Sequence, residues 1–283
     1  MRDFFKQYKK NKSAVVGLVI VIILLILAIF APFISSHLPY EQTLADRLLP
    51  PMWEEGGIST YFLGTDDFGR DLFTRIIYGA RISLMVGAVS VGVSLTFGLV
   101  MGLVAAFYGG KVDLIIMRVV DIMLSIPAIL LAIVIVSILG PSLTNAMIAI
   151  GIVGIPTYAR VVRASVLSER EKEYVIASRI NGSSNMRLMF KVILPNAATP
   201  IIVQSTMGFA SAVLEAAGLS FLGLGAQPPT PEWGAMLSDS LQFIMTAPWM
   251  IFYPGLAIFF TVLGFNLMGD GLMDVLDPKL KDK

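Results

Sequence analysis

Few side chains in this sequence belong to the types that carry out chemistry. It has no cysteine and one histidine, His37, which excludes disulfides, thiolate zinc sites and multi-histidine metal sites. The best match to a phosphate-binding loop, YGGKVD at 108–113, lacks the first glycine of that motif and the Ser or Thr after the lysine. DFG at 67–69 has no partner motif and is interpreted as a turn. We therefore expect no catalytic residue, metal or cofactor in this chain.

Two polar stretches stand out in an otherwise apolar sequence. They are LGTDDFGRD at 63–71 and EREKEYVIASRING at 169–182. Hydrophobic residues make up 56% of the 283 residues and charged residues only 14%, and the mean hydropathy is +0.79. This composition indicates a protein whose solvent is lipid. The net charge of +1 gives no reason to expect a nucleic-acid partner.

Five stretches of the sequence carry no Asp, Glu, Lys or Arg: 13–40, 82–110, 122–159, 192–214 and 240–269. A helix needs roughly 20 apolar residues to cross the hydrocarbon layer. The third stretch is too long for one crossing, and GPSLTN at 140–145 predicts a turn inside it. Dividing it there gives one span from about Val112 and another from about Leu143 to Val161. We predict an all-α membrane protein with six transmembrane helices.

The distribution of lysine and arginine predicts the orientation of these spans. The two termini and the segments after the second and fourth spans hold 17 of them, against four in the other segments. Positively charged segments stay inside, so both termini are expected in the cytoplasm. The first span is interpreted as a retained anchor, not a signal peptide. Residues 1–81 then form a cytoplasmic tail, the first helix and a periplasmic loop, and residues 82–283 form a five-helix core with a cytoplasmic loop at 164–195.

Small residues recur every four positions in the second span, which allows close approach of another helix from this chain or from a second membrane subunit. They are Ser90, Ser94, Gly98, Gly102 and Ala106.

Near the inner end of the third span, Arg118 and Asp121 are three residues apart and are expected to pair. Glu215 and Asp270 are expected at span ends, where a carboxylate reaches water.

The outer stretch begins with a Gly-Thr-Asp-Asp turn, which predicts a capped helix start. Leu72, Phe73, Ile76 and Ile77 follow on one helical side. We expect an amphipathic helix that lies at the outer membrane interface.

The inner stretch predicts a short helix near residues 173–182, ended by Asn181-Gly182 because glycine accepts a left-handed backbone. Ser-Ser-Asn at 183–185 then caps a helix that leads into the fifth span. Tyr174, Ile176, Ala177 and Ile180 are apolar and within helical reach of one another. Such a side is typical of a helix that docks in the groove of a partner.

This stretch resembles the cytoplasmic loop signature of ABC importer permeases, which is EAA, three residues, Gly, nine residues and I-x-L-P. Here it reads Ile176-Ala177-Ser178, then Gly182, then VILP ending at Pro195. Isoleucine replaces the glutamate of the signature, and Glu173, one turn earlier, is a candidate substitute. YGARISL, MRVVDIMLSIP and LSFLGLGAQPPTPEWGAMLSD extend the similarity over nearly the whole chain to the dipeptide/oligopeptide/nickel group.

The resemblance implies a type I ABC importer permease fold in a bacterial inner membrane. It implies an assembly of this chain with a second permease subunit, two cytoplasmic ATPase subunits and a periplasmic substrate-binding protein. ATP and Mg would be bound by the ATPase subunits. The solute is expected to be a dipeptide or short peptide, with oligopeptides, nickel or haem as alternatives.

Three groups of site residues are expected in such an assembly, the first from the resemblance and the other two from the polar residues of the outer loop and the spans. Contact with an ATPase subunit is expected from Glu173, Tyr174, Ile176, Ala177, Ser178, Arg179, Gly182 and Pro195. Asp66, Asp67, Arg70 and Asp71 are candidates for contact with the binding protein, and loop capping is the alternative role for them. Gln204 and Asn266 are expected to line the translocation path.

Two other classes of function remain open from the residues alone. A secondary transporter driven by an ion gradient usually needs ionisable groups deep within its spans, and the middles of the predicted spans contain none. A membrane-bound scaffold or enzyme would move no solute.

Overall fold

The computed structural model describes residues 8–276, and the regular structure in this range is helical apart from one isolated bridge between Thr65 and Asp71. Five helices are long and apolar enough to cross a membrane: α2 (Lys12–Ile34), α3 (Leu72–Tyr108), α6 (Leu143–Arg170), α10 (Ala198–Phe221) and α12 (Trp249–Leu276). The short helices are α7 (Glu173–Ile180), α8 (Asn185–Arg187), α9 (Leu194–Asn196) and α11 (Trp233–Ser240). Two single 3-10 turns occupy Leu44–Asp46 and Leu241–Phe243.

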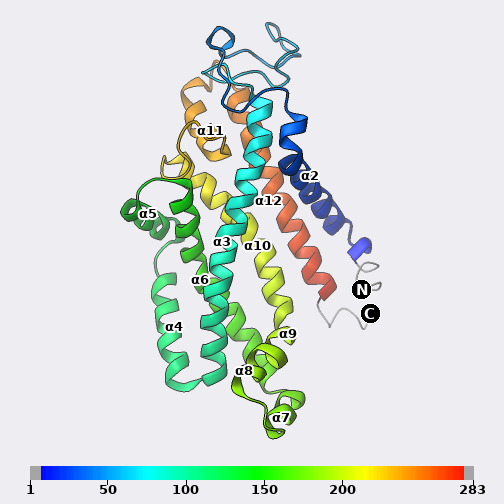
Figure 1. Ribbon diagram of the computed structural model, residues 1–283, viewed down its shortest axis with the longest axis vertical. Helices are drawn as coiled ribbons and strands as arrows, with labels where there is room; N and C mark the ends of the chain where they lie inside the picture. Colours follow the sequence, from blue (N-terminus) through cyan, green and yellow to red (C-terminus); the bar gives the residue numbers. More distant parts are fainter. Residues whose placement is uncertain (1–7, 277–283) are drawn as a thin grey trace.

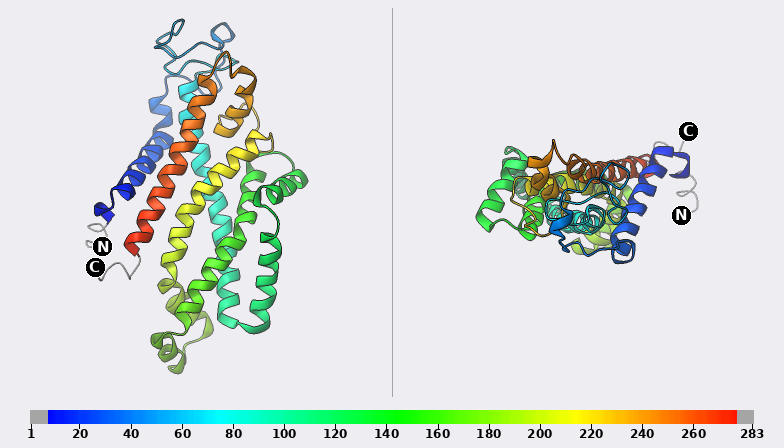
Figure 2. Two further views of the ribbon diagram at one scale, coloured as in Figure 1. Left: turned by 180° about the vertical axis from the view of Figure 1, so that it is seen from behind. Right: turned by 90° about the horizontal axis from the view of Figure 1, so that it is seen from above.

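The long helices form an elongated bundle with different structures at its two ends (Figure 1). The loop that joins α2 to α3 lies at one end together with α11, and α7 and α8 lie at the other. Figure 2 shows from behind that α2 and α12 run side by side along one flank and that α4 (Gly110–Leu124) and α5 (Ala128–Leu139) lie on the opposite flank. The two polar stretches of the sequence, 63–71 and 169–182, therefore lie at opposite ends of the bundle.

The third span is broken, which the sequence analysis did not predict. Helix α4 (Gly110–Leu124) and helix α5 (Ala128–Leu139) meet at 91°, and together they count as a sixth span. Pro127 stands between them and has no N–H to continue the helix. The expected turn at Gly140 is confirmed, because Gly140 has a φ of +92° and Ser142 caps α6.

The expected interfacial helix is wrong, because its residues begin α3 itself. Helix α3 runs unbroken for 37 residues from its Asp71 cap and crosses the expected division at residue 81. Leu72 and Ile77 are buried, at 1% and 3% exposure, and Leu72 packs in a cluster with residues of α11 and α12. The apolar side of this helix start therefore contacts other helices of the protein. The sequence pattern shows that this side is apolar, but it does not show whether protein or lipid covers it.

Helices α3 and α6 pack closely through the small residues of α3. Ser90 and Ser94 donate hydrogen bonds to the carbonyls of Met147 and Gly151, at 3.0 and 2.7 Å. A Cβ on Gly102 would lie 2.5 Å from the carbonyl oxygen of Ala159. The four-residue repeat therefore serves packing within the chain, one of the two alternatives left open by the sequence.

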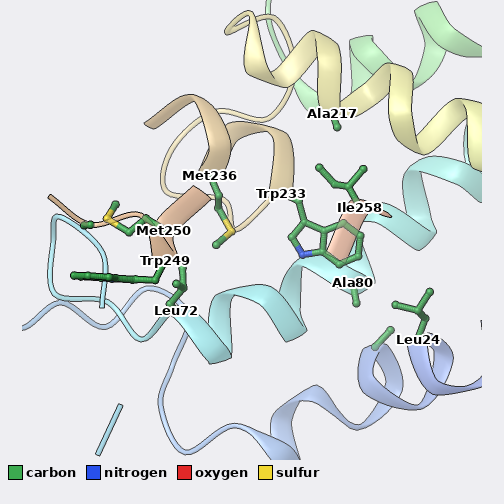
Figure 3. Close-up of a cluster of buried hydrophobic side chains, with 11 residues drawn as sticks. Leu24, Leu72, Ala80, Ala217, Trp233, Met236, Trp249, Met250 and Ile258 are labelled. Atoms are coloured by element: carbon green, nitrogen blue, oxygen red, sulfur yellow. The ribbon is translucent and has the colours of Figure 1, made fainter. Parts of the chain in front are cut away.

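The outer ends of five helices meet around Trp233 in a cluster of buried side chains (Figure 3). Leu24, Ala80 and Ile258 lie beside the indole ring, and its Nε1 donates to the carbonyl of Ile76 at 3.0 Å. Gly79 leaves room for the ring, since a Cβ there would lie 2.4 Å from Nε1. A second cluster at the inner end joins α3, α6, α7 and α10 and includes Leu103, Val162, Val175, Ile193 and Ile201.

Two ion pairs join α4 to α6. Asp113 of α4 bonds Arg163 of α6, with Oδ1 to Nε at 2.5 Å. Asp121 bonds Arg160 at 2.6 Å, not Arg118 as expected. The i,i+3 spacing permitted the local pair, but α6 places the guanidinium of Arg160 against Asp121 across the helix contact.

The close approach of α3 and α6 makes Gly102→Ala destabilising. Overpacking costs about 1–3 kcal/mol, which exceeds the roughly 1 kcal/mol that alanine gains over glycine in a helix. Gly92→Ala, on the same helix, is the matched control because a Cβ at Gly92 meets nothing within 4 Å. Thermal unfolding in detergent should show a lower Tm for the first variant only, and equal Tm values would contradict the packing.

Candidate functional sites

The inner loop presents α7 as a short, well-terminated helix. Gly182 follows its end with a φ of +79°, donates to the carbonyl of Arg179 at 3.0 Å, and precedes Ser183, whose N–H donates to the carbonyl of Ser178 at 3.2 Å. This pair of bonds is the Schellman motif, which glycine favours. The Oγ atoms of Ser178 and Ser183 also lie 3.0 Å apart in a hydrogen bond. The predicted end of the helix is confirmed.

One side chain fastens α7 to the membrane helices. Val175 is fully buried in the inner cluster, between the ends of α3 and α6 and the segment that precedes α10. Val175 was not among the predicted contact residues, because the sequence does not reveal which of the apolar residues of α7 faces the protein. Its burial is what couples the position of α7 to the spans.

The rest of the apolar side of α7 faces outward. Tyr174, Ile176, Ala177 and Ile180 are exposed, Ile180 at 79%. The Tyr174 hydroxyl donates to Glu169 at 2.5 Å, and burial together with this bond raises the pKa of Tyr174 to about 12. Glu173 and Arg179 are exposed as well. Met186 and Phe190, which follow in the sequence, are also apolar, and their side chains are 62% and 43% exposed. The loop therefore displays an apolar surface that no described residue covers.

The connection to α10 is an irregular helix. Ser184 caps α8 by accepting from the N–H of Arg187 at 3.4 Å, and a π-helical segment at Leu188–Ile193 follows. Pro195 comes two residues later and cannot donate to the carbonyl of residue 191. The widened turn therefore precedes the proline that would interrupt an α-helix, and π-helical turns often occur at functional sites.

At the outer end, Asp66 is the centre of a buried ionic cluster. It accepts from Arg70 Nε at 2.6 Å and from the backbone N–H groups of Phe68 and Arg70, and it lies 3.4 Å from Arg75 Nε. Arg75 in turn donates to the carbonyls of Pro39 and Pro229. It thus joins two loops that are far apart in sequence, a role that the sequence analysis did not assign to it.

The four predicted contact residues of this outer stretch differ in exposure. Asp66, Arg70 and Asp71 are each exposed by 5% or less. Asp71 caps α3 by accepting from the N–H of Thr74 at 2.9 Å. Asp67 is partly exposed, and burial together with the neighbouring charge of Asp66 raises its pKa. Beside it, Phe68 is 43% exposed under the Arg70 guanidinium.

A polar cavity of about 190 Å³ lies inside the bundle between α3, α6, α10 and the break of the third span. Gln204 lines it, together with Ser94, Tyr158, Ser211 and Glu215. Asn266 is exposed on α12 and lies outside it. Glu215 was expected at a span end, but it stands six residues before the end of α10 and lines this cavity.

Helices that span a membrane, a polar cavity between them and a short helix presented at one end define a membrane permease subunit. Residues 94–282 match the family described as binding-protein-dependent transport system inner membrane component. Residues 1–51 match the N-terminal TM domain of oligopeptide transport permease C. The chain belongs to this permease family and is a multi-pass protein of the bacterial inner membrane.

Relatives with assigned names cover nearly all of the chain. It is 56% identical over 281 residues to the dipeptide transport system permease protein DppC of Escherichia coli (strain K12), covering 99% of this chain and 94% of that protein. It is 55% identical over 280 residues to the DppC of Alkalihalophilus pseudofirmus, covering 99% and 90%. The expected similarity to the dipeptide/oligopeptide/nickel group is confirmed.

The fold is also found in solved structures. A chain of the MetNI methionine ABC transporter in an inward-facing conformation matches with a TM-score of 0.60 at 21% identity, covering 72% of this chain and 97% of that one. At this identity the likeness concerns the fold alone. It confirms the type I ABC importer permease fold expected from the sequence.

The ionic cluster predicts opposite effects for two adjacent aspartates. Asp66→Asn removes the carboxylate nearest to the buried Arg70 and Arg75 and should destabilise the protein by about 3 kcal/mol. Asp67→Asn should change stability little or raise it slightly, because the raised pKa shows that its ionised form is disfavoured in the folded protein. Thermal unfolding at pH 7 in detergent measures both, and equal losses would contradict the central position of Asp66.

Proposed function

We propose that this chain is the permease subunit of an ATP-driven importer of dipeptides and other short peptides. It pairs with a second permease subunit, two cytoplasmic ATPase subunits and a periplasmic binding protein, and the ATPase subunits bind ATP and Mg and carry out hydrolysis. The names of the relatives support the substrate. The observation that carries the coupling role is α7, which is fixed to the spans through Val175 and exposes an apolar side.

In this proposal α7 docks in a groove of an ATPase subunit. Tyr174, Ile176, Ala177 and Ile180 supply the apolar contact, and Glu173 and Arg179 supply charges beside it. Ser178, Gly182 and Pro195 act differently: they terminate α7 and shape the connection to α10. A docked helix transmits movement only if it does not fray, and the bonds at Gly182 supply that stiffness.

The outer end contacts the binding protein through the surface that its buried cluster supports. Asp67 and Phe68 have the exposure needed for direct contact, while Asp66, Arg70 and Asp71 hold the loop in shape from beneath. Gln204 lines the passage within the polar cavity. Asn266 is on the exposed side of α12, so it would line the passage only where that side faces it.

The proposal is tested with the assembled importer. A tag on this chain should purify a complex that contains ATPase chains, whose hydrolysis rises when peptide-loaded binding protein is added. In proteoliposomes the complex should accumulate a labelled dipeptide only when ATP is present on the ATPase side. Accumulation by this chain alone, or no accumulation by the full complex with dipeptide-loaded binding protein, would overturn it.

Gly182→Val tests the coupling role of α7 in the same assay. A β-branched residue at a φ of +79° is strained, at a cost of about 1–2 kcal/mol. The amount of peptide imported per ATP hydrolysed should fall roughly tenfold. Gly182→Asn is the matched control, because asparagine tolerates the left-handed region and should retain most of the coupling. Equal coupling in the two variants would contradict a role for the helix end.

A further inference from the structure

The polar cavity contains one carboxylate, on the side of α10 that faces the other walls. Gln204, Gly208, Ser211 and Glu215 all line the cavity and follow at helical spacing. Gln204 and Glu215 are eleven residues apart, or about 16 Å along the helix. The polar stripe therefore covers the middle of α10, with Gln204 toward its inner end and Glu215 toward its outer end.

The Glu215 carboxylate is unpaired within the chain. It is partly buried, and no hydrogen bond or ion pair joins it to another residue between 8 and 276. The residues that line the cavity include no lysine, arginine or histidine. An ionisable group within a membrane span that faces the bundle interior without a partner is a candidate for contact with the transported species.

The other polar groups of the cavity include several acceptors. The hydroxyls of Ser90 and Ser94 donate to backbone carbonyls of α6, and the hydroxyl of Tyr158 donates to the carbonyl of Gln204 at 3.4 Å. Their hydrogens are thus used within the protein, and their oxygens keep free lone pairs. With the carboxylate above them, they suit a ligand that carries positive charge and several donors.

We propose that Glu215 binds the α-ammonium group of a short peptide as it passes through the bundle. An unblocked peptide carries this group at neutral pH whatever its side chains are, so one carboxylate serves many sequences. The ammonium donates to the carboxylate, and hydroxyl oxygens of the cavity accept from the remaining N–H groups of the peptide. The inference rests on the proposed function and names the part of the substrate that the permease itself recognises.

The test measures peptide binding to the assembled complex in nanodiscs without the binding protein. A labelled unblocked dipeptide should bind to the wild-type complex, and the N-acetylated form of the same dipeptide should compete at least about tenfold more weakly. Glu215→Gln should weaken binding by at least about tenfold, as expected when a charged hydrogen-bond partner is removed. Asp270→Asn removes one carboxylate from α12 outside the cavity and should bind as wild type does.

Three results would overturn the inference: equal competition by the N-acetylated dipeptide, wild-type affinity of Glu215→Gln, or no binding to the wild-type complex. The first and third results are obtained with the wild-type complex, so they test the inference even if Glu215→Gln fails to assemble. Glu215→Asp, which keeps the charge, should retain binding within about threefold. Uptake by the wild-type complex with its binding protein tests the proposed function separately, and it can succeed while this site fails.

Discussion

The close contact between α3 and α6 is the constraint on which the rest of the structure depends. Serines and glycines on α3 remove the side-chain bulk that would separate the helices, and lipid offers no hydrophobic drive to hold them otherwise. The middle of this contact forms one wall of the polar cavity, and its inner end forms one side of the cluster that holds Val175. A change in the α3–α6 distance would therefore alter the cavity and the seat of α7 together.

The sequence predicted the features that arise from local chemistry. Gly182 ends α7 because a left-handed residue is needed there, and long uncharged runs become helices because the backbone must be satisfied within lipid. It did not predict Val175, Arg75 or Glu215 in their roles. Each depends on what a distant helix places opposite it, which the residue types around it do not reveal. The break before α5 was the exception: Pro127 was visible, but the 91° bend depends on packing against α6 and α10.

The ionic contacts described above pair carboxylates with arginines, both between helices and at the outer end. Asp113 and Asp121 of α4 pair with arginines of α6, and at the outer end Asp66 neutralises Arg70 and Arg75. Burial of a charge is costly unless a partner and hydrogen bonds compensate it. Glu215 departs from this rule because it is partly buried and unpaired. Because the other buried charges described above have partners, this exception points to a functional role for Glu215.

The outer loops and α7 are held by different kinds of contact, which bears on how movement passes through the bundle. The outer end combines a cluster around Trp233 with an ionic network that joins two loops, so its parts are bonded directionally. Helix α7 is instead held by apolar contacts with α3, α6 and the π-helical segment, which are not directional, while ion pairs join α4 to α6. A force on α7 would therefore act through this apolar cluster on α3, α6 and the segment that leads into α10, and these three helices wall the cavity.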